Sequence, residues 1–521
     1  MIKVWCARAG LGVLAFLCNP AGVLTAQIAK RSSSQMKNMI VRHKKWMLAE
    51  AVVVLLMVFC IDCGNSVAQE PLARHTATTQ VDEHLHRFAE GGKFKMLYDA
   101  RQRPQGILVK DIVFVVYNGD ARPSSNGKGR AYPMLICYDR KKKKFNSPIR
   151  LANESSTDHH DSPIIWADRD GHLHVLYGCH RSPGVHLVTA EPVGNDAVEI
   201  RWVKGAQIAP RMSYPCVFRM TDGKDLIYYR TDGHTSSWTY RMTADNGMSW
   251  SGPKNDVTDL DAGGRLDWSS YQTKIPSLDR KSLHVVYTDY DDNKNHFDEQ
   301  RFFNPKYRTF VSNEWKYNLS YIRIEAESGR VFNGQGRVME TPIDIDTSEQ
   351  SCEIWDTNWR GAGVPPAVAL NEQGAPVFLH VLSGDSLEQH DYYYVRKTGR
   401  DWKKTRITSS THQWNSGHLA CDEHGILHAY VVTGAKYLQG GYMDRHGGGV
   451  IEEWRSKDSG EQWEKVSQVS PMGPGYGSWR FNNVQPVLNA DGSIAKGILL
   501  FYGWNEKDEP NASAFLIDRM K

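Results

Sequence analysis

The sequence predicts an all-β protein, because a short apolar strand pattern recurs along it and turn residues separate the copies. The pattern occurs seven times, at 112–117, 173–177, 226–229, 283–287, 377–381, 426–432 and 498–502. Six copies closely follow a turn motif such as Arg-Asp-Gly or Asn-Ala-Asp-Gly, and helical periodicity is scarce. Successive copies start 49 to 94 residues apart, most of them about 50–60. Units of that length with several short strands are typical of propeller blades, so we expect a seven-bladed β-propeller.

Two further patterns support this architecture. The segments 243–250 (TADNGMSW) and 456–463 (SKDSGEQW) resemble the Asp boxes of sialidases, in which Asp and Gly shape a turn and Trp packs between blades. Their role is structural, so they bear on the fold and not on the activity. The widest spacing between repeats predicts an insertion at about 290–350 over one face. A β-sandwich or a two-domain β protein is the alternative architecture.

The N-terminal part reads as an export signal. Residues 39–68 have a basic start, an apolar stretch and the small-residue site Ser66-Val67-Ala68. We therefore divide the chain into 1–68, an extension with a secretory signal, and 69–521, the propeller, with Met39 as a possible true start. The expected location is secreted or periplasmic, without stable membrane association after cleavage. A retained signal anchor is the alternative.

Charge and cysteine content exclude some classes of protein. The whole chain has 63 Lys and Arg against 59 Asp and Glu, but residues 1–68 hold 8 and 2 of these, which leaves 55 against 57 in the mature chain. A net charge of −2 offers no general basic surface, so we expect no nucleic-acid partner. Five cysteines remain after the leader, an odd and scattered set that predicts free thiols and no disulfide framework. The oligomeric state is not predictable from these features.

Reactive side chains stand at the open ends of two repeat hairpins, 159–180 and 213–230. Antiparallel strands bring the start of the first strand beside the end of the second. His160 and His180 should therefore share one rim, and Tyr214 and Arg230 the matching rim of the next hairpin. Tyr271 stands 12 residues before its repeat strand, as Tyr214 does, and His160 stands 13 before its own. A single His at a strand end is usually structural, but the matched set predicts one polar site.

These two hairpins resemble the propeller ulvan lyases of polysaccharide lyase families 24 and 25, and more broadly the BNR-repeat family to which those enzymes belong. The resemblance implies that His160, His180, Tyr214 and Arg230 are catalytic and that Tyr271 binds substrate. It also implies an anionic polysaccharide partner, ulvan, a sulfated polymer of rhamnose and uronate. The implied reaction is β-elimination, which leaves an unsaturated uronyl end.

The chemistry fits those residue types. Removal of the proton beside a uronate carboxylate requires a cation to stabilise the developing charge, and the planar guanidinium of Arg230 can pair with a carboxylate bidentately. His180 could share that contact. A base must take the proton and an acid must protonate the leaving oxygen. Tyr214 and His160 are the candidates, and the sequence does not assign base and acid between them.

Metal ions are not required for this reaction, but the sequence contains candidate ligands. His418 and Cys421 lie close together, and Cys352 and His234 could complete a tetrahedral structural zinc site. The resemblance to lyases that carry structural ions supports the idea. The acidic stretch 289–293 could bind calcium, although a solvated loop is the simpler interpretation.

Two other functions compete with the lyase. A sialidase-like glycoside hydrolase would use the same fold, but it needs an acidic pair, and none stands out at the repeat rim. A non-catalytic carbohydrate-binding propeller would keep the aromatic residues without needing His160, Tyr214 and Arg230 together.

Overall fold

Antiparallel β-strands dominate the computed structural model, which describes residues 83–90, 95–122, 130–194, 200–233, 236–258, 268–291, 301–312, 314–410, 412–434, 447–505 and 512–520. These residues all belong to one compact unit, Thr79–Lys521. The predicted extension and leader, 1–68, lie outside the described residues. No helix within the described ranges is long and apolar enough to cross a membrane.

Four sheets of the described part are four-stranded antiparallel meanders. The first contains β7 (Ile164–Ala167), β8 (Leu173–Tyr177), β9 (Val185–Thr189) and β10 (Trp202–Lys204). The second contains β11 (Ser213–Arg219), β12 (Asp225–Arg230), β13 (Ser237–Thr243) and β14 (Lys254–Thr258). The third contains β24 (Ala367–Leu370), β25 (Pro376–Ser383), β26 (His390–Thr398) and β27 (Asp401–Ser409). The fourth contains β28 (His418–Cys421), β29 (Leu427–Thr433), β30 (Val450–Ser456) and β31 (Glu464–Gln468).

A nine-stranded sheet joins the two ends of the unit. Its N-terminal strands are β1 (Leu85–Glu90), β2 (Gly106–Val109), β3 (Ile112–Arg122), β4 (Arg130–Asp139), β5 (Lys144–Phe145) and β6 (Ile149–Arg150). Its C-terminal strands are β32 (Trp479–Asn489), β33 (Ile494–Asn505) and β34 (Ala512–Asp518). The order is β1–β34–β33–β32–β2–β3–β4–β5, with β6 beside β4. β1 pairs antiparallel with β34 and β2 pairs parallel with β32, so the first and last strands of the unit hold each other.

The seven-stranded sheet includes several strands from the region 290–350, where an insertion was predicted. Its strands are β15 (Trp268–Pro276), β16 (Ser282–Asp291), β19 (Lys316–Glu325), β20 (Val331–Asn333), β21 (Val338–Met339), β22 (Glu353–Trp355) and β23 (Gly361–Ala362). A separate hairpin, β17 (Arg301–Asn304) with β18 (Thr309–Ser312), and the helix α2 (Ile345–Ser351) lie between these strands in the chain. The prediction of one block at 290–350 needs correction, because β19 pairs with β16 along its length and belongs to the sheet itself.

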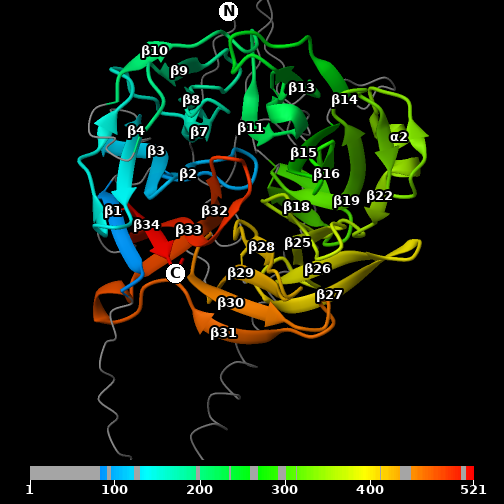
Figure 1. Ribbon diagram of the computed structural model, residues 1–521. Helices are drawn as coiled ribbons and strands as arrows, with labels where there is room; N and C mark the ends of the chain where they lie inside the picture. Colours follow the sequence, from blue (N-terminus) through cyan, green and yellow to red (C-terminus); the bar gives the residue numbers. More distant parts are fainter. Residues whose placement is uncertain are drawn as a thin grey trace, which may run out of the picture. The chain divides into compact units, whose positions relative to one another are not determined.

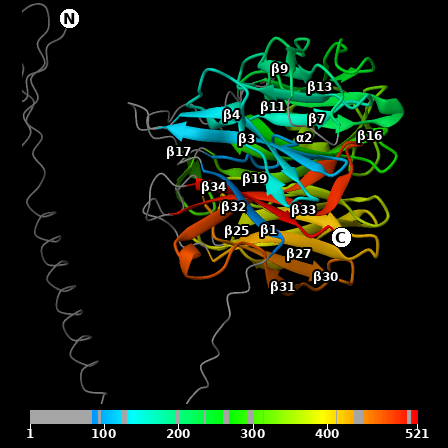
Figure 2. The ribbon, with the colours of Figure 1, turned by 60° about the vertical axis from the view of Figure 1, so that its left-hand side comes forward.

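The sheets follow one another in chain order around a ring, in a propeller-like arrangement (Figure 1). The first strands of neighbouring units contact each other: β2 with β7, β7 with β11, β15 with β24, β24 with β28, and β28 with β32. In the turned view of Figure 2, β1 again lies beside the C-terminal strands. The starts of these inner strands therefore come close to one another although they are far apart in sequence.

The seven predicted repeat copies are all strands, and this confirms the hairpin unit. They lie in β3, β8, β12, β16, β25, β29 and β33. Each pairs antiparallel with the strand before it in the chain. Each copy is thus the second strand of a hairpin, and it pairs with the strand that contacts the neighbouring unit.

Both predicted Asp boxes form turns held by their aspartate. The Asp245 carboxylate accepts hydrogen bonds from the backbone N–H of Ser249 at 2.9 Å and from the Thr243 hydroxyl at 2.7 Å. The Asp458 carboxylate likewise accepts from the backbone N–H of Gln462 at 3.0 Å. Trp463 packs edge-on against Tyr394 of β26, in the neighbouring sheet, with ring centroids 5.4 Å apart. The boxes thus support packing between sheets, as the sequence predicts.

We predict that closure of the ring depends on the apolar face of β34. Phe515 is fully buried and stacks on Phe501 with ring centroids 5.1 Å apart. Phe515→Ala should lower the free energy of unfolding by about 3–5 kcal/mol, because it removes a large buried ring and leaves a cavity. Denaturant unfolding followed by circular dichroism measures the loss. The matched control is Phe303→Ala, whose ring is 49% exposed. Equal stability losses in the two variants would contradict the role assigned to β34.

Candidate active site

The structure brings together all five residues that the sequence predicts for catalysis and substrate binding. His160 lies in a short 3-10 helix, His159–Asp161, just before β7, and His180 lies in the loop after β8. Their rings stack with centroids 4.4 Å apart. The Tyr214 ring lies edge-on to His160 at 5.6 Å, and Tyr271 of β15 lies edge-on to Tyr214 at 5.5 Å.

A carboxylate that the sequence analysis did not single out holds the two histidines. One oxygen of Asp158 lies 2.5 Å from Nδ1 of His160, and the other lies 2.5 Å from Nδ1 of His180. Asp158 also caps the 3-10 helix by accepting the backbone N–H of His160 at 3.0 Å. The sequence offered one indication of this role, because Asp158 stands two positions before His160 and Asp is a common N-terminal cap of a helical turn.

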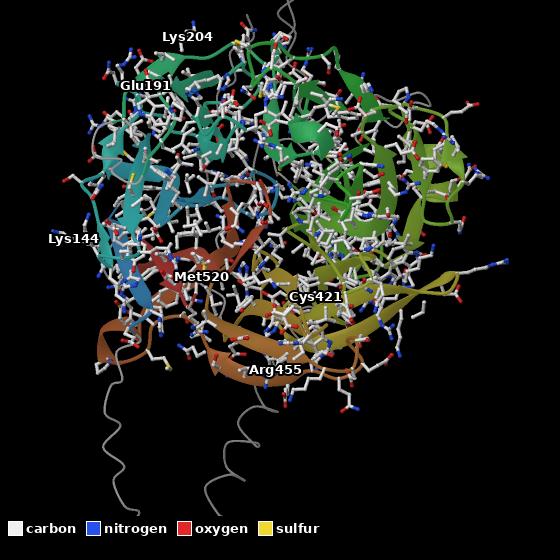
Figure 3. All side chains as sticks on the ribbon, viewed as in Figure 1. Lys144, Glu191, Lys204, Cys421, Arg455 and Met520 are labelled. Carbon is white, nitrogen blue, oxygen red and sulfur yellow. The ribbon has the colours of Figure 1, made fainter. Side chains whose placement is uncertain are left out.

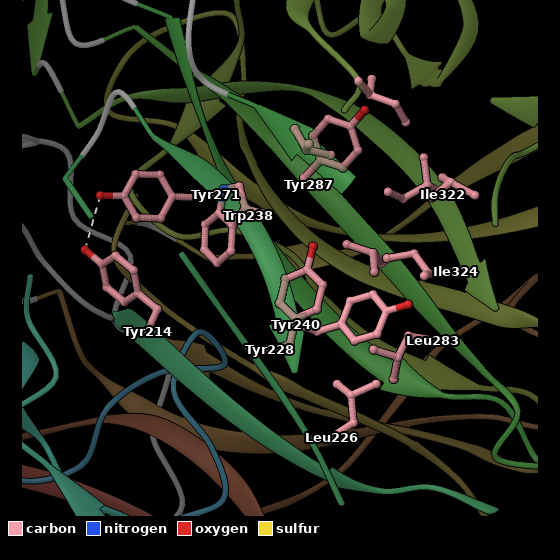
Figure 4. Packing of buried hydrophobic residues seen from close by; sticks show 14 of the residues in the cluster. Tyr214, Leu226, Tyr228, Trp238, Tyr240, Tyr271, Leu283, Tyr287, Ile322 and Ile324 are labelled. Atoms are coloured by element: carbon pink, nitrogen blue, oxygen red, sulfur yellow. Dashed lines mark hydrogen bonds between the residues drawn. The ribbon is translucent and has the colours of Figure 1, made fainter. Parts of the chain in front are cut away.

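The two tyrosines form a hydrogen-bonded pair. Their phenol oxygens lie 3.2 Å apart, at the edge of a large apolar cluster that includes Trp238 (Figure 4). Both side chains are almost fully buried, with exposures of 2% for Tyr214 and 4% for Tyr271. Because burial is nearly complete, each hydroxyl needs a partner, and the pair supplies one for each.

The backbone at Tyr214 is unusual. Its φ is 56°, in the left-handed region that bulky residues seldom adopt, and the β11–β12 register shifts between Ser213 and Cys216. Pro215 follows directly, which restricts the backbone of Tyr214 further. Strain of this kind persists only where the surroundings enforce it, and it is often found at functional sites. The bulge changes the direction of the Tyr214 side chain relative to a regular strand.

Cations surround the phenol pair. Arg230, the last residue of β12, is fully buried, and its guanidinium carbon lies 4.9 Å from the Tyr214 ring centroid and 5.2 Å from that of Tyr271. Ser213 pairs with Arg230 across the hairpin, so the predicted shared rim is present. Lys316 of β19 places its side-chain nitrogen 4.6 Å from the Tyr271 centroid, and burial lowers its pKa well below the usual value. These contacts add favourable electrostatic energy where water is excluded.

A second arginine in the site was missed in the sequence. The guanidinium carbon of Arg101 lies 5.4 Å from the Tyr214 centroid and 5.1 Å from that of Tyr271. Asp99 holds it through two hydrogen bonds of 2.8 and 2.6 Å, and Tyr98 packs against it. These residues precede β2 and lie outside the repeat, so no repeat spacing could have indicated them.

The pKa values of the two proton-transfer candidates move in opposite directions. Burial lowers the pKa of His160 to about 4, against the opposing effect of Asp158. Burial and the neighbouring Tyr271 raise the pKa of Tyr214 well above its usual value, although Arg230 and Arg101 oppose this shift. Burial alone would raise the pKa of Asp158, but the hydrogen bonds from the two histidines outweigh it and lower that pKa. Near neutral pH the imidazole of His160 is therefore unprotonated at one nitrogen and the Tyr214 phenol keeps its proton.

The predicted zinc site is not formed by its three described members. Cys352 is buried beside Tyr287 in one apolar cluster, whereas Cys421 packs against a different cluster, on β28 (Figure 3). His418 is on the same strand three positions earlier, where alternation sends the two side chains to opposite faces. His234 lies outside the described residues, as does part of the acidic stretch 289–293 proposed for calcium. The prediction failed because closeness in sequence does not place strand residues on one face.

One group of three potential ligands does meet the spacing for a metal ion among the described residues. It consists of Asp158, His160 and His180. Both carboxylate oxygens already accept from the two imidazoles, so hydrogen bonding accounts for the group.

Comparison with known proteins places the chain in a family. The model of the BNR repeat-containing family matches residues 134–410, more than half of the sequence. The chain belongs to the BNR repeat-containing family. The matched range includes both site hairpins and the strand that carries Tyr271.

Similar proteins in this comparison include ulvan lyases. The chain is 22% identical over 461 residues to an ulvan lyase of polysaccharide lyase family 25 from Pseudoalteromonas sp. (strain PLSV), covering 80% of this chain and 84% of that protein. It is 20% identical over 458 residues to an ulvan lyase from Nonlabens ulvanivorans, covering 81% and 86%. A solved family 25 ulvan lyase superposes with a TM-score of 0.64 at 17% identity, covering 83% of this chain and 95% of that one. The described part of this BNR repeat-containing protein thus shares the fold of that lyase.

We predict that His160 stays unprotonated at Nε2 well below pH 6.5. In a histidine-selective carbon-13 NMR titration, its signal, assigned with His160→Gln, should move near pH 4. His428 serves as an internal contrast, because its hydrogen bond to Glu453 raises its pKa. His160 has a folded-state pKa below its unfolded value, so its contribution lowers stability as pH falls from about 6.5 towards 4. A His160 midpoint at or above that of His428 would contradict the buried environment described here.

Proposed function

We propose that this protein is an ulvan lyase, which cleaves a uronate-containing sulfated polysaccharide by β-elimination. The observation that carries the proposal is the joint placement of His160, His180, Tyr214, Arg230 and Tyr271 in one largely buried cluster. The relatives with sequence similarity over most of the chain are ulvan lyases. A solved family 25 ulvan lyase with a TM-score of 0.63 at 16% identity, covering 83% of this chain and 95% of that one, is bound to -[GlcA(1-4)Rha3S]-. That ligand contains a uronate, which carries a carboxylate, linked to a sulfated rhamnose.

In the proposed mechanism, Arg230 pairs with the uronate carboxylate and stabilises the charge that develops when the adjacent C–H bond breaks. His180 lies beside His160 and shares the Asp158 carboxylate with it. Nε2 of His160 takes the proton from C5. The electron pair forms the C4=C5 double bond, the C4–O bond breaks, and the Tyr214 hydroxyl gives its proton to the leaving oxygen. Solvent then returns the proton from His160 to Tyr214.

The assignment of base and acid rests on the opposite pKa shifts of the two groups. A neutral imidazole accepts a proton and a protonated phenol donates one, and separated pKa values are the usual sign of such a division. Tyr271 supports Tyr214 through the hydrogen bond between their hydroxyls. Arg230 supplies the positive charge at the carboxylate, so the proposed reaction requires no metal cofactor.

Two carboxylates in the described part of the site, Asp158 and Asp99, favour a lyase over a glycoside hydrolase. A hydrolase needs one carboxylic acid and one free carboxylate on either side of the bond that breaks. Asp158 is engaged by two imidazoles, and Asp99 by Arg101. Neither is placed to act as an acid on a sugar.

We also propose the finer architecture and the location that the sequence predicts. The nine-stranded sheet divides at the parallel pair β2–β32 into a four-stranded unit (β1, β32, β33 and β34) and a five-stranded unit (β2 to β6), which would complete seven blades. An experimental structure of residues 69–521 tests that number. The signal pattern at 39–68 supports secretion or transfer to a periplasm, and N-terminal sequencing of the exported protein tests cleavage after Ala68.

We predict that Tyr214→Phe and Arg230→Lys abolish turnover of ulvan, by roughly 1,000-fold or more, because each removes a group used in the transition state. The assay follows the ultraviolet absorbance of the unsaturated uronyl product. Tyr229→Phe is the matched control, since this buried tyrosine of β12 donates no proton in the mechanism and contacts Arg241. Parent activity should persist after treatment with a chelator.

Other outcomes of the assay identify the competing functions. New reducing ends without that absorbance would indicate hydrolysis. Retained polymer binding without either signal would indicate a carbohydrate-binding propeller. Activity of Tyr214→Phe close to that of Tyr229→Phe, with both proteins folded, would refute the site.

A further inference from the structure

One carboxylate lies between the two histidines of the site and contacts the Nδ1 atom of each ring. We propose that Asp158 is a positioning residue that fixes His160 and His180 in one tautomer, with the proton on Nδ1. The tautomer follows from the contacts between Asp158 and the two Nδ1 atoms alone. Its consequence for turnover rests on the proposed function. The proposal assigns a role to a residue that touches neither the phenol pair nor Arg230 in the described contacts.

The geometry determines where the ring protons lie. An ionised carboxylate accepts hydrogen bonds and donates none. Each oxygen of Asp158 lies 2.5 Å from one Nδ1, so both Nδ1 atoms are donors. In a neutral imidazole the other nitrogen is then the acceptor. His160 therefore has the lone pair on Nε2 that a base at this site requires.

Asp158 is itself held on several sides. Its backbone N–H donates to the Ser156 hydroxyl at 2.9 Å, and Ser156 exchanges two backbone hydrogen bonds with Ala131, of 2.9 and 2.8 Å. The backbone N–H of Gly178 donates to the Asp161 carbonyl at 3.1 Å and ties the loop of His180 to the turn of His160. The carboxylate thus stands at a fixed point between the two loops, which limits rotation of both rings.

The single negative charge also restricts the protonation of the pair. The rings stack 4.4 Å apart, so two adjacent imidazolium ions would repel each other. The negative charge of Asp158 can balance the positive charge of one additional proton on the His160–His180 pair. When His160 takes the substrate proton, the carboxylate stabilises the imidazolium that forms, as the buried aspartate does in a Ser-His-Asp triad. His180 can donate from Nε2 to a substrate carboxylate only when it carries that proton instead.

Asp158→Asn separates this role from simple packing. The amide has nearly the same shape, but its oxygen accepts from only one Nδ1–H, and its NH₂ group faces the other ring as a donor. That ring must move its proton to Nε2 or rotate away. We expect kcat on ulvan to fall by roughly 100- to 10,000-fold, with KM changed by less than about threefold, because substrate contacts remain while the base is misoriented. Asp158→Glu should recover at least about tenfold of the loss, since it restores two acceptors.

The matched control is Asp161→Asn, three residues further along the same turn. The Asp161 carboxylate accepts from the Ser156 hydroxyl at 2.6 Å, and the amide oxygen of Asn can still accept that bond. This variant should keep kcat within about fivefold of the parent.

Nitrogen-15 NMR of histidine-labelled protein reads the tautomer without any substrate. Signals are assigned with His160→Gln and His180→Gln. In the parent both Nδ1 atoms should be protonated, and in Asp158→Asn one of them should lose its proton. Protonated Nδ1 in both rings of Asp158→Asn, or kcat of that variant within about threefold of the parent, would overturn the proposal. A parent without lyase activity would refute the proposed function, whereas the tautomers would still test the placement of Asp158.

Discussion

Pairing between the ends of the folded unit is the constraint on which the rest of this structure depends. β1 adds to β34, and β2 lies parallel to β32, so the first and last sheets become continuous. A series of separate hairpin sheets would leave exposed edges and an open core at its ends. Closure lets neighbouring inner strands, such as β2 and β7 or β24 and β28, contact each other around the ring. It also fixes the distance between inner strands, which sets how closely residues of different sheets can approach.

The site is a direct result of that arrangement. His160, Tyr214 and Tyr271 stand near the starts of three successive inner strands, and ring geometry brings these starts together. Burial then changes their chemistry. It lowers the pKa of His160 and raises that of Tyr214. The two groups therefore differ strongly in how readily they give up a proton. Arg230 and Arg101 add positive charge against the phenol rings, where the low dielectric strengthens their effect.

The sequence analysis identified the residues that obey the repeat and missed those that do not. His160, His180, Tyr214, Arg230 and Tyr271 were found because hairpins place the ends of paired strands together and the offsets recur. Arg101 and Lys316 reach the same rings from a segment before the first repeat and from a third strand, β19. No local spacing connects them to the site. The zinc prediction failed for the opposite reason, since His418 and Cys421 are close in sequence but lie on opposite faces of one strand.

By itself, the sequence determined the all-β class, the hairpin repeat and the five residues at its rim. These are consequences of alternation, turn chemistry and strand pairing, which act over a few residues and can be counted along the chain. Only the tertiary structure decided the partners: Asp158 between two imidazoles, Arg101 beside the phenols, and the bulge that gives Tyr214 its left-handed backbone. Those features depend on the separation of segments in space and on the exclusion of water around them. Neither the separation of distant segments nor the exclusion of water can be predicted from local sequence, because both arise when the ring closes.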